Sequence, residues 1–381
     1  MKKKVMAIFG TRPEAIKMAP LVKLLQQQED LQTIVTVTAQ HREMLDQVLK
    51  LFDINPDYDL DIMQANQTLF DVTTKALLGL KKVLEEAKPD LVLVHGDTTT
   101  TFVASLASFY LQIPVGHVEA GLRTGNKYSP FPEEMNRKLT GSMADLHFAP
   151  TRTSKENLLQ EKVDSDKIFI TGNTVIDALL STVKEDYAFP QGLETVDLSK
   201  KTLLVTTHRR ENLGEPMRQV YLALKRILEK YSELQVVFPV HKNPKVREVV
   251  QEILGDLSQV VLIEPLDYEP FINLMAKSHI VLTDSGGLQE EAPSLGKPVL
   301  VLRDTTERPE ALEAGTVRLV GTEEEVVYSN LLELLQDQEV YKVMANAVNP
   351  YGDGQASRRI VEAIRFYFGL SLDKPENFKT D

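Results

Sequence analysis

Residues 4–39 read KVMAIFGTRPEAIKMAPLVKLLQQQEDLQTIVTVTA, and this stretch decides the fold class. Two apolar runs of strand length, at 4–10 and 33–39, flank a segment at 14–28 whose apolar residues recur with the period of an α-helix. A strand, a helix and a second strand in this order form a βαβ unit, in which the two strands lie parallel in one sheet. The stretch therefore predicts an α/β fold with a parallel sheet.

The same pattern continues along the chain and restarts after a polar break at 181–200, where we place the connection between two domains. In the first half, further strands are predicted at 91–96, 113–119 and 146–150, and further helices at 42–51, 68–87 and 99–111. In the second half, strands are predicted at 202–208, 235–241, 259–265, 279–285 and 297–303, and helices at 215–230, 244–254, 269–276 and 286–294. We expect an N-terminal domain over 1–180, a C-terminal domain over 181–354, and a helix within 355–381 that packs back onto the first domain.

The composition of the 381 residues is that of a soluble globular protein, with 43% hydrophobic and 26% charged residues. A net charge of −12 disfavours nucleic acid and anionic membrane surfaces as partners. The absence of cysteine excludes disulfides, thiolate nucleophiles and Cys-ligated metals. The apolar run after the basic start is too short for a signal peptide, and no run approaches the roughly 20 residues of a membrane span. We expect a cytosolic protein.

Three acidic side chains follow predicted strands or lie in a loop of the first half. Ligands of an open parallel sheet bind beyond the carboxyl ends of its strands. Asp97 ends LVLVHGD and Glu119 ends IPVGHVE, one crossover further on, so we expect their strands to be neighbours. The alternatives are a helix N-cap for Asp97 and an ion pair with Arg123 for Glu119. Glu133, in the loop YSPFPEEMNR, is by itself more typical of an ordinary loop charge.

Basic side chains also follow strands. Arg12 and Lys17 stand at the start of the first helix, where cations are unfavourable unless an anion joins them; the alternative is two solvated surface charges. His208 follows the first strand of the second half, and its chemistry suits acid–base catalysis or an oxyanion contact, although a lone strand-end histidine is often structural. His241 repeats this placement with the same two alternatives.

The segment DSGGLQEE at 284–291 predicts an anion site, because a strand ends in a turn of small residues that opens a helix. Glu291, one turn into that helix, could accept hydrogen bonds from two adjacent hydroxyls, and Arg303 and Arg308 could reach the same anion. The alternative is an ordinary turn in which Ser285 caps the helix. No GxGxxG follows the first strand, and no P-loop or HExxH occurs, so neither a dinucleotide nor a metal cofactor is expected.

Taken together, seven motifs resemble one enzyme family. They are FGTRPEAIKMAPL (9–21), VHGDTTTT (94–101), GHVEAGLRT (116–124), SPFPEEMNR (129–137), TGNTVIDAL (171–179), TTHRRENLG (206–214) and DSGGLQEEAPSLGKPVLVLRDTTERPEAL (284–312). The chain closely resembles the bacterial non-hydrolysing UDP-N-acetylglucosamine 2-epimerases from about residue 4 to about 370. The resemblance implies two Rossmann-like domains with parallel sheets in the glycosyltransferase type-B arrangement, with the active site in the interdomain cleft.

The resemblance also implies the reaction. UDP-N-acetylglucosamine and UDP-N-acetylmannosamine would interconvert without NAD, metal or any other cofactor, through elimination of UDP to 2-acetamidoglucal and its readdition, to supply cell-surface polysaccharide. Matched to the family's motifs, the catalytic residues are Asp97, Glu119, Glu133 and His208. The residues matched to substrate and UDP binding are Arg12, Lys17, Arg137, Phe271, Ser285, Gly286, Gly287, Glu291 and Arg308.

Two further expectations come from the resemblance: a homodimer, and a regulatory site for a second UDP-N-acetylglucosamine near Gln40, Arg209 and His241. Where the family often has Gln before the aromatic residue of the second domain, this chain has Leu266, so a side-chain contact is lost there. Three other functions stay open: a hydrolysing epimerase that releases free N-acetylmannosamine, a glycosyltransferase, and a non-catalytic sugar-nucleotide sensor.

Overall fold

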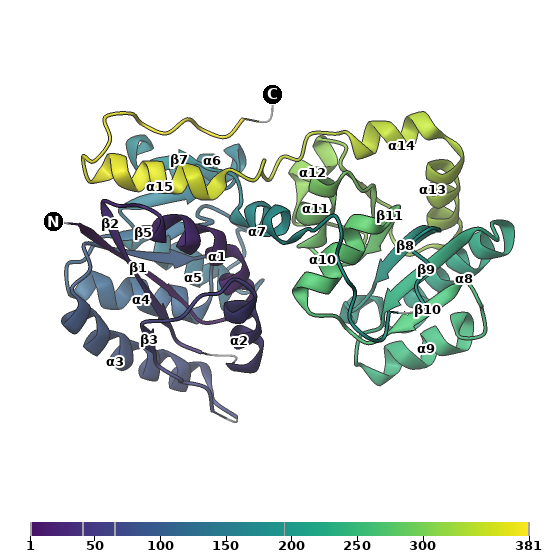
Figure 1. Cartoon of the computed structure of the whole chain (residues 1–381), viewed down its shortest axis with the longest axis horizontal. Coiled ribbons are helices and arrows are strands. Elements are labelled where there is room, and N and C mark those ends of the chain that lie inside the picture. Colours follow the sequence, from purple (N-terminus) through teal and green to yellow (C-terminus); the bar gives the residue numbers. More distant parts are fainter. Residues whose placement is uncertain (1, 40–41, 65, 194, 380–381) are drawn as a thin grey trace. The chain divides into compact units, whose positions relative to one another are not determined.

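The computed structural model describes residues 2–39, 42–64, 66–193 and 195–379. The chain divides into two compact units (Figure 1). Unit 1 contains the chain up to Ser181 together with Tyr351–Lys379, and unit 2 contains Thr182–Pro350. Each unit holds one sheet, and every strand pairing in both sheets is parallel. The α/β fold with parallel sheets predicted from the sequence is confirmed.

Unit 1 contains a seven-stranded sheet in the order β3-β2-β1-β4-β5-β6-β7. Its strands are β1 (Lys3–Phe9), β2 (Leu31–Val37), β3 (Tyr58–Asp59), β4 (Leu91–His95), β5 (Val115–Val118), β6 (Leu146–Ala149) and β7 (Ile168–Ile170). Its helices are α1 (Arg12–Gln26), α2 (Arg42–Leu51), α3 (Leu69–Ala87), α4 (Thr99–Tyr110), α5 (Glu133–Met143), α6 (Arg152–Gln160), α7 (Thr174–Thr182) and α15 (Ala356–Tyr367). Helices α1, α2 and α15 pack side by side, and α3, α4 and α5 form a second group.

Unit 2 repeats this plan with a six-stranded sheet in the order β10-β9-β8-β11-β12-β13. Its strands are β8 (Lys201–Thr206), β9 (Leu234–Pro239), β10 (Val260–Ile263), β11 (Ile280–Thr283), β12 (Val299–Val301) and β13 (Val317–Leu319). Its helices are α8 (Glu215–Lys230), α9 (Pro244–Leu254), α10 (Tyr268–Lys277), α11 (Leu288–Glu291), α12 (Pro309–Glu313), α13 (Glu324–Gln336) and α14 (Gln338–Ala345). The predicted helix over 286–294 is wrong in part, because α11 has four residues and continues as a 3₁₀ turn, Ala292–Leu295.

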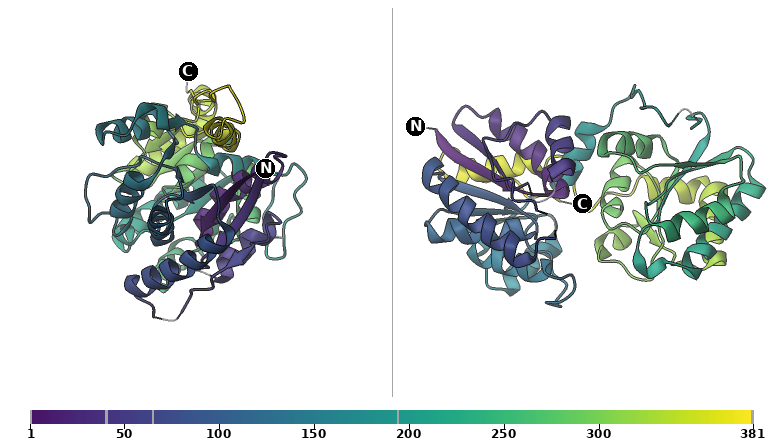
Figure 2. Two further views of the ribbon diagram at one scale, coloured as in Figure 1. Left: turned by 90° about the vertical axis from the view of Figure 1, so that its left-hand side faces the viewer. Right: turned by 90° about the horizontal axis from the view of Figure 1, so that it is seen from below.

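The segment Tyr351–Lys379 returns to unit 1, in which helix α15 lies against α1 (Figures 1 and 2). Arg365 of α15 forms an ion pair with Asp30 at 2.8 Å, and the carboxylate of Asp177 accepts hydrogen bonds from the first backbone N–H groups of α15. Beyond α15, the N–H of Phe378 donates to the carbonyl of Ile170 in the edge strand β7, which covers part of an otherwise open sheet edge. Within the described ranges, no helix combines the length and hydropathy that crossing a lipid bilayer requires.

Candidate functional site

The strand order of unit 1 reverses between β1 and β4, and ligands of open α/β sheets bind at such a switch point. β1 pairs with β4, and β4 pairs with β5, with His95 opposite Val118 in the register. The expectation that the strands before Asp97 and Glu119 are neighbours is therefore confirmed. The segments after these three strands carry most of the polar side chains predicted for the first half.

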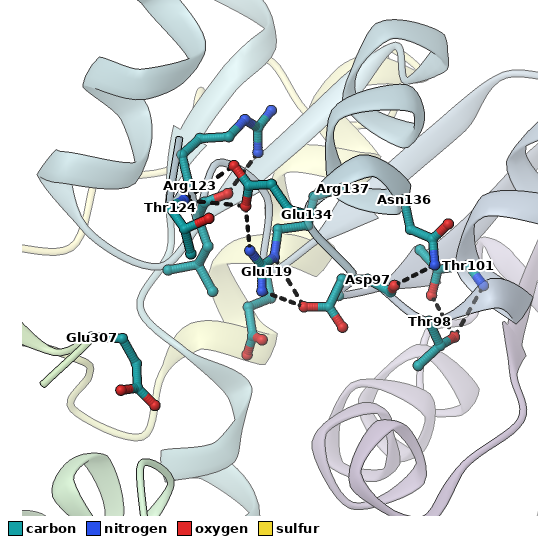
Figure 3. A network of polar contacts seen from close by, with 12 residues as sticks. Asp97, Thr98, Thr101, Glu119, Arg123, Thr124, Glu134, Asn136, Arg137 and Glu307 are labelled. Carbon is teal, nitrogen blue, oxygen red and sulfur yellow. Dashed lines mark hydrogen bonds and ion pairs between the residues drawn. The ribbon is translucent and has the colours of Figure 1, made fainter. Parts of the chain in front are cut away.

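Asp97 forms an ion pair with Arg137 and does not cap a helix (Figure 3). Its carboxylate accepts hydrogen bonds from the Nε and Nη2 atoms of Arg137, at 2.9 and 2.8 Å, and its carbonyl accepts one from Asn136. The N-cap of α4 is Thr98, whose hydroxyl accepts a hydrogen bond from the backbone N–H of Thr101. The N-cap alternative for Asp97 is thus wrong, and the carboxylate is partly exposed at the switch point.

Glu119 lies directly after β5, and its backbone has a left-handed φ of 61°, a conformation that is uncommon for a residue with a side chain. Its carboxylate forms an ion pair with Lys17 and accepts a hydrogen bond from Asn173 Nδ2 at 2.9 Å. His95 Nε2 lies 3.6 Å from the same carboxylate. The alternative of an ion pair with Arg123 is wrong, because Arg123 instead pairs with Glu161 at 2.7 Å.

The charge of Glu119 follows from these contacts. Burial by itself raises the pKa of this carboxyl, but the Lys17 ammonium and His95 outweigh burial and hold the pKa well below its usual range. Glu119 is therefore ionised at neutral pH. Glu119 thus supplies the anion that the position of Lys17 at the start of α1 requires. Arg12, at the same helix end, makes no side-chain hydrogen bond or ion pair with any described residue.

The first turn of α5 carries two glutamates with different surroundings. Glu133 is half-buried, and its side chain makes no hydrogen bond or ion pair within the described part of the chain. Glu134 is buried, pairs with Arg137 at 2.8 Å and accepts hydrogen bonds from the backbone N–H groups of Thr124 and Gly125 (Figure 3). Glu134 therefore links the loop after β5 to the arginine that holds Asp97.

The strand order of unit 2 reverses between β8 and β11, and polar residues again follow both strands. His208 follows β8 and Asp284 follows β11. The Nδ1 atom of His208 lies 2.9 Å from Oδ1 of Asp284, and the backbone N–H groups of His208 and Arg209 donate to Oδ2 of the same carboxylate. The histidine ring also stacks loosely on His241, with 6.2 Å between ring centroids.

The turn at 285–287 matches the predicted strand–turn–helix in outline. The N–H of Ser285 donates to the hydroxyl of Thr283, and Gly287 opens α11 without a side-chain cap, so the alternative of a serine cap is wrong. Glu291, at the end of α11, is buried and accepts a hydrogen bond from the Tyr268 hydroxyl at 3.4 Å. Phe271 is half-buried on α10, the helix that also carries Tyr268.

Four further basic side chains considered for this site, those of Arg308, Arg303, Arg209 and His241, contact acids or backbone groups. Arg308 pairs with buried Glu290, and Arg303 pairs with Glu211 and Glu307. Arg209 donates to the carbonyl of Asp284 and contacts Glu307. Nδ1 of His241 accepts a hydrogen bond from the N–H of Asn243. The predicted regulatory residue Gln40 lies outside the described residues.

Several residues of the two sites were missed by sequence reasoning. Glu14, buried in the first turn of α1, accepts hydrogen bonds from the N–H groups of Gly10 and Thr11 and from the hydroxyls of Thr98 and Thr101, and so ties the loops after β1 and β4 together. Its position three residues after Thr11 is a capping-box signal that could have found it. No comparable sequence pattern indicates a role for His95, Asn173 or Glu134. The described residues contain no cluster of His, Asp and Glu suited to holding a metal ion.

Comparisons with known proteins agree on one family. Residues 23–365 match the family described as UDP-N-acetylglucosamine 2-epimerase. The chain is 60% identical over 379 residues to the UDP-N-acetylglucosamine 2-epimerase of Bacillus subtilis (strain 168), covering 99% of both chains. It is similar to the crystal structure of UDP-GlcNAc 2-epimerase from Neisseria meningitidis bound to UDP-GlcNAc, with a TM-score of 0.84, 55% identity and coverage of 95% of this chain and 99% of that one.

A more distant structure has the same fold. The enzyme from Methanocaldococcus jannaschii in complex with UDP-GlcNAc and UDP has a TM-score of 0.73 and 34% identity, with coverage of 95% of this chain and 99% of that one. These likenesses confirm that both units are Rossmann-like and that the fold class is that of glycosyltransferases of type B.

Proposed function

The chain belongs to the UDP-N-acetylglucosamine 2-epimerase family, and on that premise we propose that it interconverts UDP-N-acetylglucosamine and UDP-N-acetylmannosamine without hydrolysis. The proposed route is elimination of UDP to 2-acetamidoglucal, followed by readdition of UDP. The observation that carries the proposal is the pair of strand-end carboxylates, Asp97 and Glu119, each ionically paired at the switch point of unit 1.

The chemistry explains why both acids and cations are needed. The proton on sugar carbon 2 is not next to a carbonyl, so a carboxylate cannot readily remove it from the intact substrate. Once the bond between carbon 1 and the phosphate oxygen breaks, the electron pair leaves with UDP, and the positive character of carbon 1 acidifies that proton. The proposed enzyme must therefore stabilise the departing UDP and also accept a proton.

We assign proton transfer to Asp97, Glu119 and Glu133. Inversion at carbon 2 requires removal of the proton from one face and delivery to the other, which calls for more than one acid–base group. Glu119 is ionised at neutral pH and so can accept a proton, while its lowered pKa makes it a weaker base than a free glutamate. Arg137 holds Asp97 through two hydrogen bonds and so restricts the direction of that carboxylate.

UDP binding is assigned to the basic and backbone groups. Arg12 and Arg308 with the turn Ser285–Gly287 are proposed to bind the phosphates, with His208 contacting the oxygen that leaves carbon 1. Glu291 and Phe271 are proposed to bind the ribose and uracil. The role expected for Lys17 changes, because its pairing with Glu119 makes it the counter-ion of the proposed base. Gln40, Arg209 and His241 stay the proposed regulatory site.

We also propose a homodimer that works in the cytosol and supplies N-acetylmannosamine units for cell-surface polysaccharide. Two large apolar side chains on α3, Phe70 at 85% and Leu78 at 59% exposure, support a dimer, because their spacing of eight residues places them on one helix face. Light scattering of the parent and of Phe70→Arg tests this assembly. A parent that runs as a monomer at all concentrations would end the dimer proposal.

The experiment that tests the function is incubation with UDP-N-acetylglucosamine in deuterium oxide, with carbon 2 observed by NMR. We expect deuterium at carbon 2 and formation of UDP-N-acetylmannosamine. Asp97→Asn, Glu119→Gln and Glu133→Gln should keep UDP affinity within a few-fold while exchange drops by about 10²- to 10⁴-fold. Parental exchange in all three variants would refute the catalytic assignment.

The same spectra separate the alternatives. Free N-acetylmannosamine with stoichiometric UDP would indicate a hydrolysing epimerase, and transfer of the sugar to an added acceptor would indicate a glycosyltransferase. Binding of UDP-N-acetylglucosamine without any exchange would indicate a sensor.

A further inference from the structure

The carboxylate of Asp284 is completely buried, and its two oxygens have different surroundings. Oδ2 accepts hydrogen bonds from the backbone N–H groups of His208 and Arg209, both at 2.9 Å, and lies 3.5 Å from the amide nitrogen of Asn212. Oδ1 has no hydrogen-bond partner among the described residues apart from the imidazole of His208, whose Nδ1 lies 2.9 Å away.

This asymmetry determines where the imidazole carries its proton. A buried carboxylate oxygen without a donor is unfavourable, whereas a proton on Nδ1 satisfies Oδ1 directly. Although burial raises the pKa of Asp284, His208 and the backbone donors outweigh burial, and the pKa stays below its usual value. Asp284 is therefore charged, and among the described residues Nδ1 of His208 is the only donor placed at its second oxygen.

We propose that Asp284 is a positioning residue for His208: its Oδ1 holds a proton on Nδ1 whether the ring is neutral or charged, which fixes the orientation of the imidazole and turns Nε2 toward the phosphate oxygen that leaves carbon 1. Nε2 donates to that oxygen from the imidazolium form, whose positive charge the Asp284 carboxylate balances. This inference rests on the proposed role of His208 in UDP departure. The bond between carbon 1 and oxygen breaks with its electron pair on the phosphate oxygen, and the imidazolium donates a hydrogen bond to that oxygen without giving up its proton. The side chain of His208 is 42% exposed, so the ring is accessible to a ligand.

Other charged groups around His208 do not replace Asp284. The ring centroids of His241, after β9, and His208 are 6.2 Å apart, and Nδ1 of His241 already accepts a hydrogen bond from the N–H of Asn243. Arg209 contacts the carbonyl of Asp284 and Glu307. Among the described residues, Asp284 is thus the one acid in direct contact with the His208 imidazole.

The first test reads the tautomer in ligand-free protein, independently of any reaction. In Asp284→Asn, the amide oxygen can keep the two backbone hydrogen bonds while the NH₂ group faces Nδ1, which then becomes an acceptor. Nitrogen-15 NMR of labelled histidine should show neutral His208 protonated on Nδ1 in the parent and on Nε2 in the variant, with peaks assigned by His208→Gln. The same tautomer in both proteins would overturn the proposal.

The second test is a double-mutant cycle on turnover. We expect Asp284→Asn and His208→Gln each to lower kcat by about 10²-fold, and the double variant to lie within about three-fold of the lower single variant. Asp177→Asn is the matched control, because Asp177 is also buried and also accepts two backbone N–H groups, yet contacts no histidine; its kcat should stay parental.

The outcomes separate this inference from the proposed function. Multiplicative losses in the double variant would show that Asp284 acts independently of His208 and would overturn the inference. Full activity in His208→Gln would instead remove His208 from the proposed reaction, whatever the tautomer. A variant that fails to fold is recognised by its circular dichroism, and Asp284→Glu, which keeps the charge, then serves in its place: the proposal requires it to retain the Nδ1 proton and more activity than Asp284→Ala.

Discussion

Replacing Lys17 by Met should destabilise unit 1 in a manner that depends on pH. Lys17 and Glu119 are 18% and 8% exposed, so neither charge is well solvated. In the parent, the pKa of Glu119 lies below its usual value, so the pair's stabilisation is fully present above the unfolded pKa of about 4.3 and is lost as pH falls through the folded pKa. Without Lys17, burial should raise the pKa of Glu119 instead.

The expected magnitude follows from what remains around the carboxylate. Breaking a buried ion pair by removing one partner typically costs about 3–5 kcal/mol. Asn173 still donates to Glu119 in the variant, and the carboxyl can take up a proton, so we expect a loss of about 2–3 kcal/mol at pH 7.5. The difference in the free energy of unfolding between parent and variant should decrease as pH falls toward 4, because protonation of Glu119 removes the unpaired charge.

Urea unfolding at pH 7.5, 6 and 4.5, followed by circular dichroism, measures this difference. Lys81→Met is the matched control, since it makes the same substitution in the same unit at an exposed pair, Lys81–Glu85 at 3.8 Å, and should cost less than about 1 kcal/mol. A Lys17→Met loss no larger than the control's, or one that does not change with pH, would refute the account of Glu119 as a buried anion held by Lys17.

Three further outcomes are expected. Arg12→Ala should lower turnover by about 10²-fold or more while the urea midpoint stays parental, because its side chain contacts no described polar group and is assigned to UDP alone; an unchanged turnover would contradict that role. Gly10→Ala should destabilise the protein by about 3 kcal/mol in thermal unfolding, since a Cβ would lie 2.0 Å from the hydroxyl of Thr38; a parental melting temperature would contradict this. Burial lowers the pKa of His117 to about 3, so the unfolded chain takes up a proton below pH 6.5 while the folded chain does not, and stability falls as pH decreases. His117→Gln should therefore lose less stability than the parent between pH 7 and pH 4, as urea midpoints at the two pH values would show.

The sequence predicts the sheets well wherever a strand is buried on both faces. Such strands, for example β1 and β4, read as unbroken apolar runs. Strands β3, β7 and β13 were not predicted, because strands of two or three residues carry too little pattern. The helix predicted after β11 was too long because Pro293 and the left-handed Gly296 end it early, a tertiary turn that periodicity does not report.

The positions of the site residues could be predicted, but their partners could not. A parallel sheet brings the residues after its strands to one edge, so Asp97 and Glu119 are found from the topology alone. The partner of Glu119 is Lys17, 102 residues away in the sequence, and not the nearer Arg123 that the sequence offers as an alternative. The sequence does not predict the burial of Glu134, because that burial depends on the contacts of its carboxylate with Thr124 and Gly125 in the loop after β5.

Unit 1 is built from both ends of the chain, and this has a consequence for synthesis on the ribosome. The face of α1 that α15 covers is completed only after all of unit 2 has been translated, a delay on the order of 10 to 30 s at roughly 5–20 residues per second. During that interval unit 2 can finish folding, while the nascent first unit still exposes the surface that Ile360 and Ile364 later bury. A chain that terminates early, after Pro350, would leave that surface permanently open to chaperones and proteases.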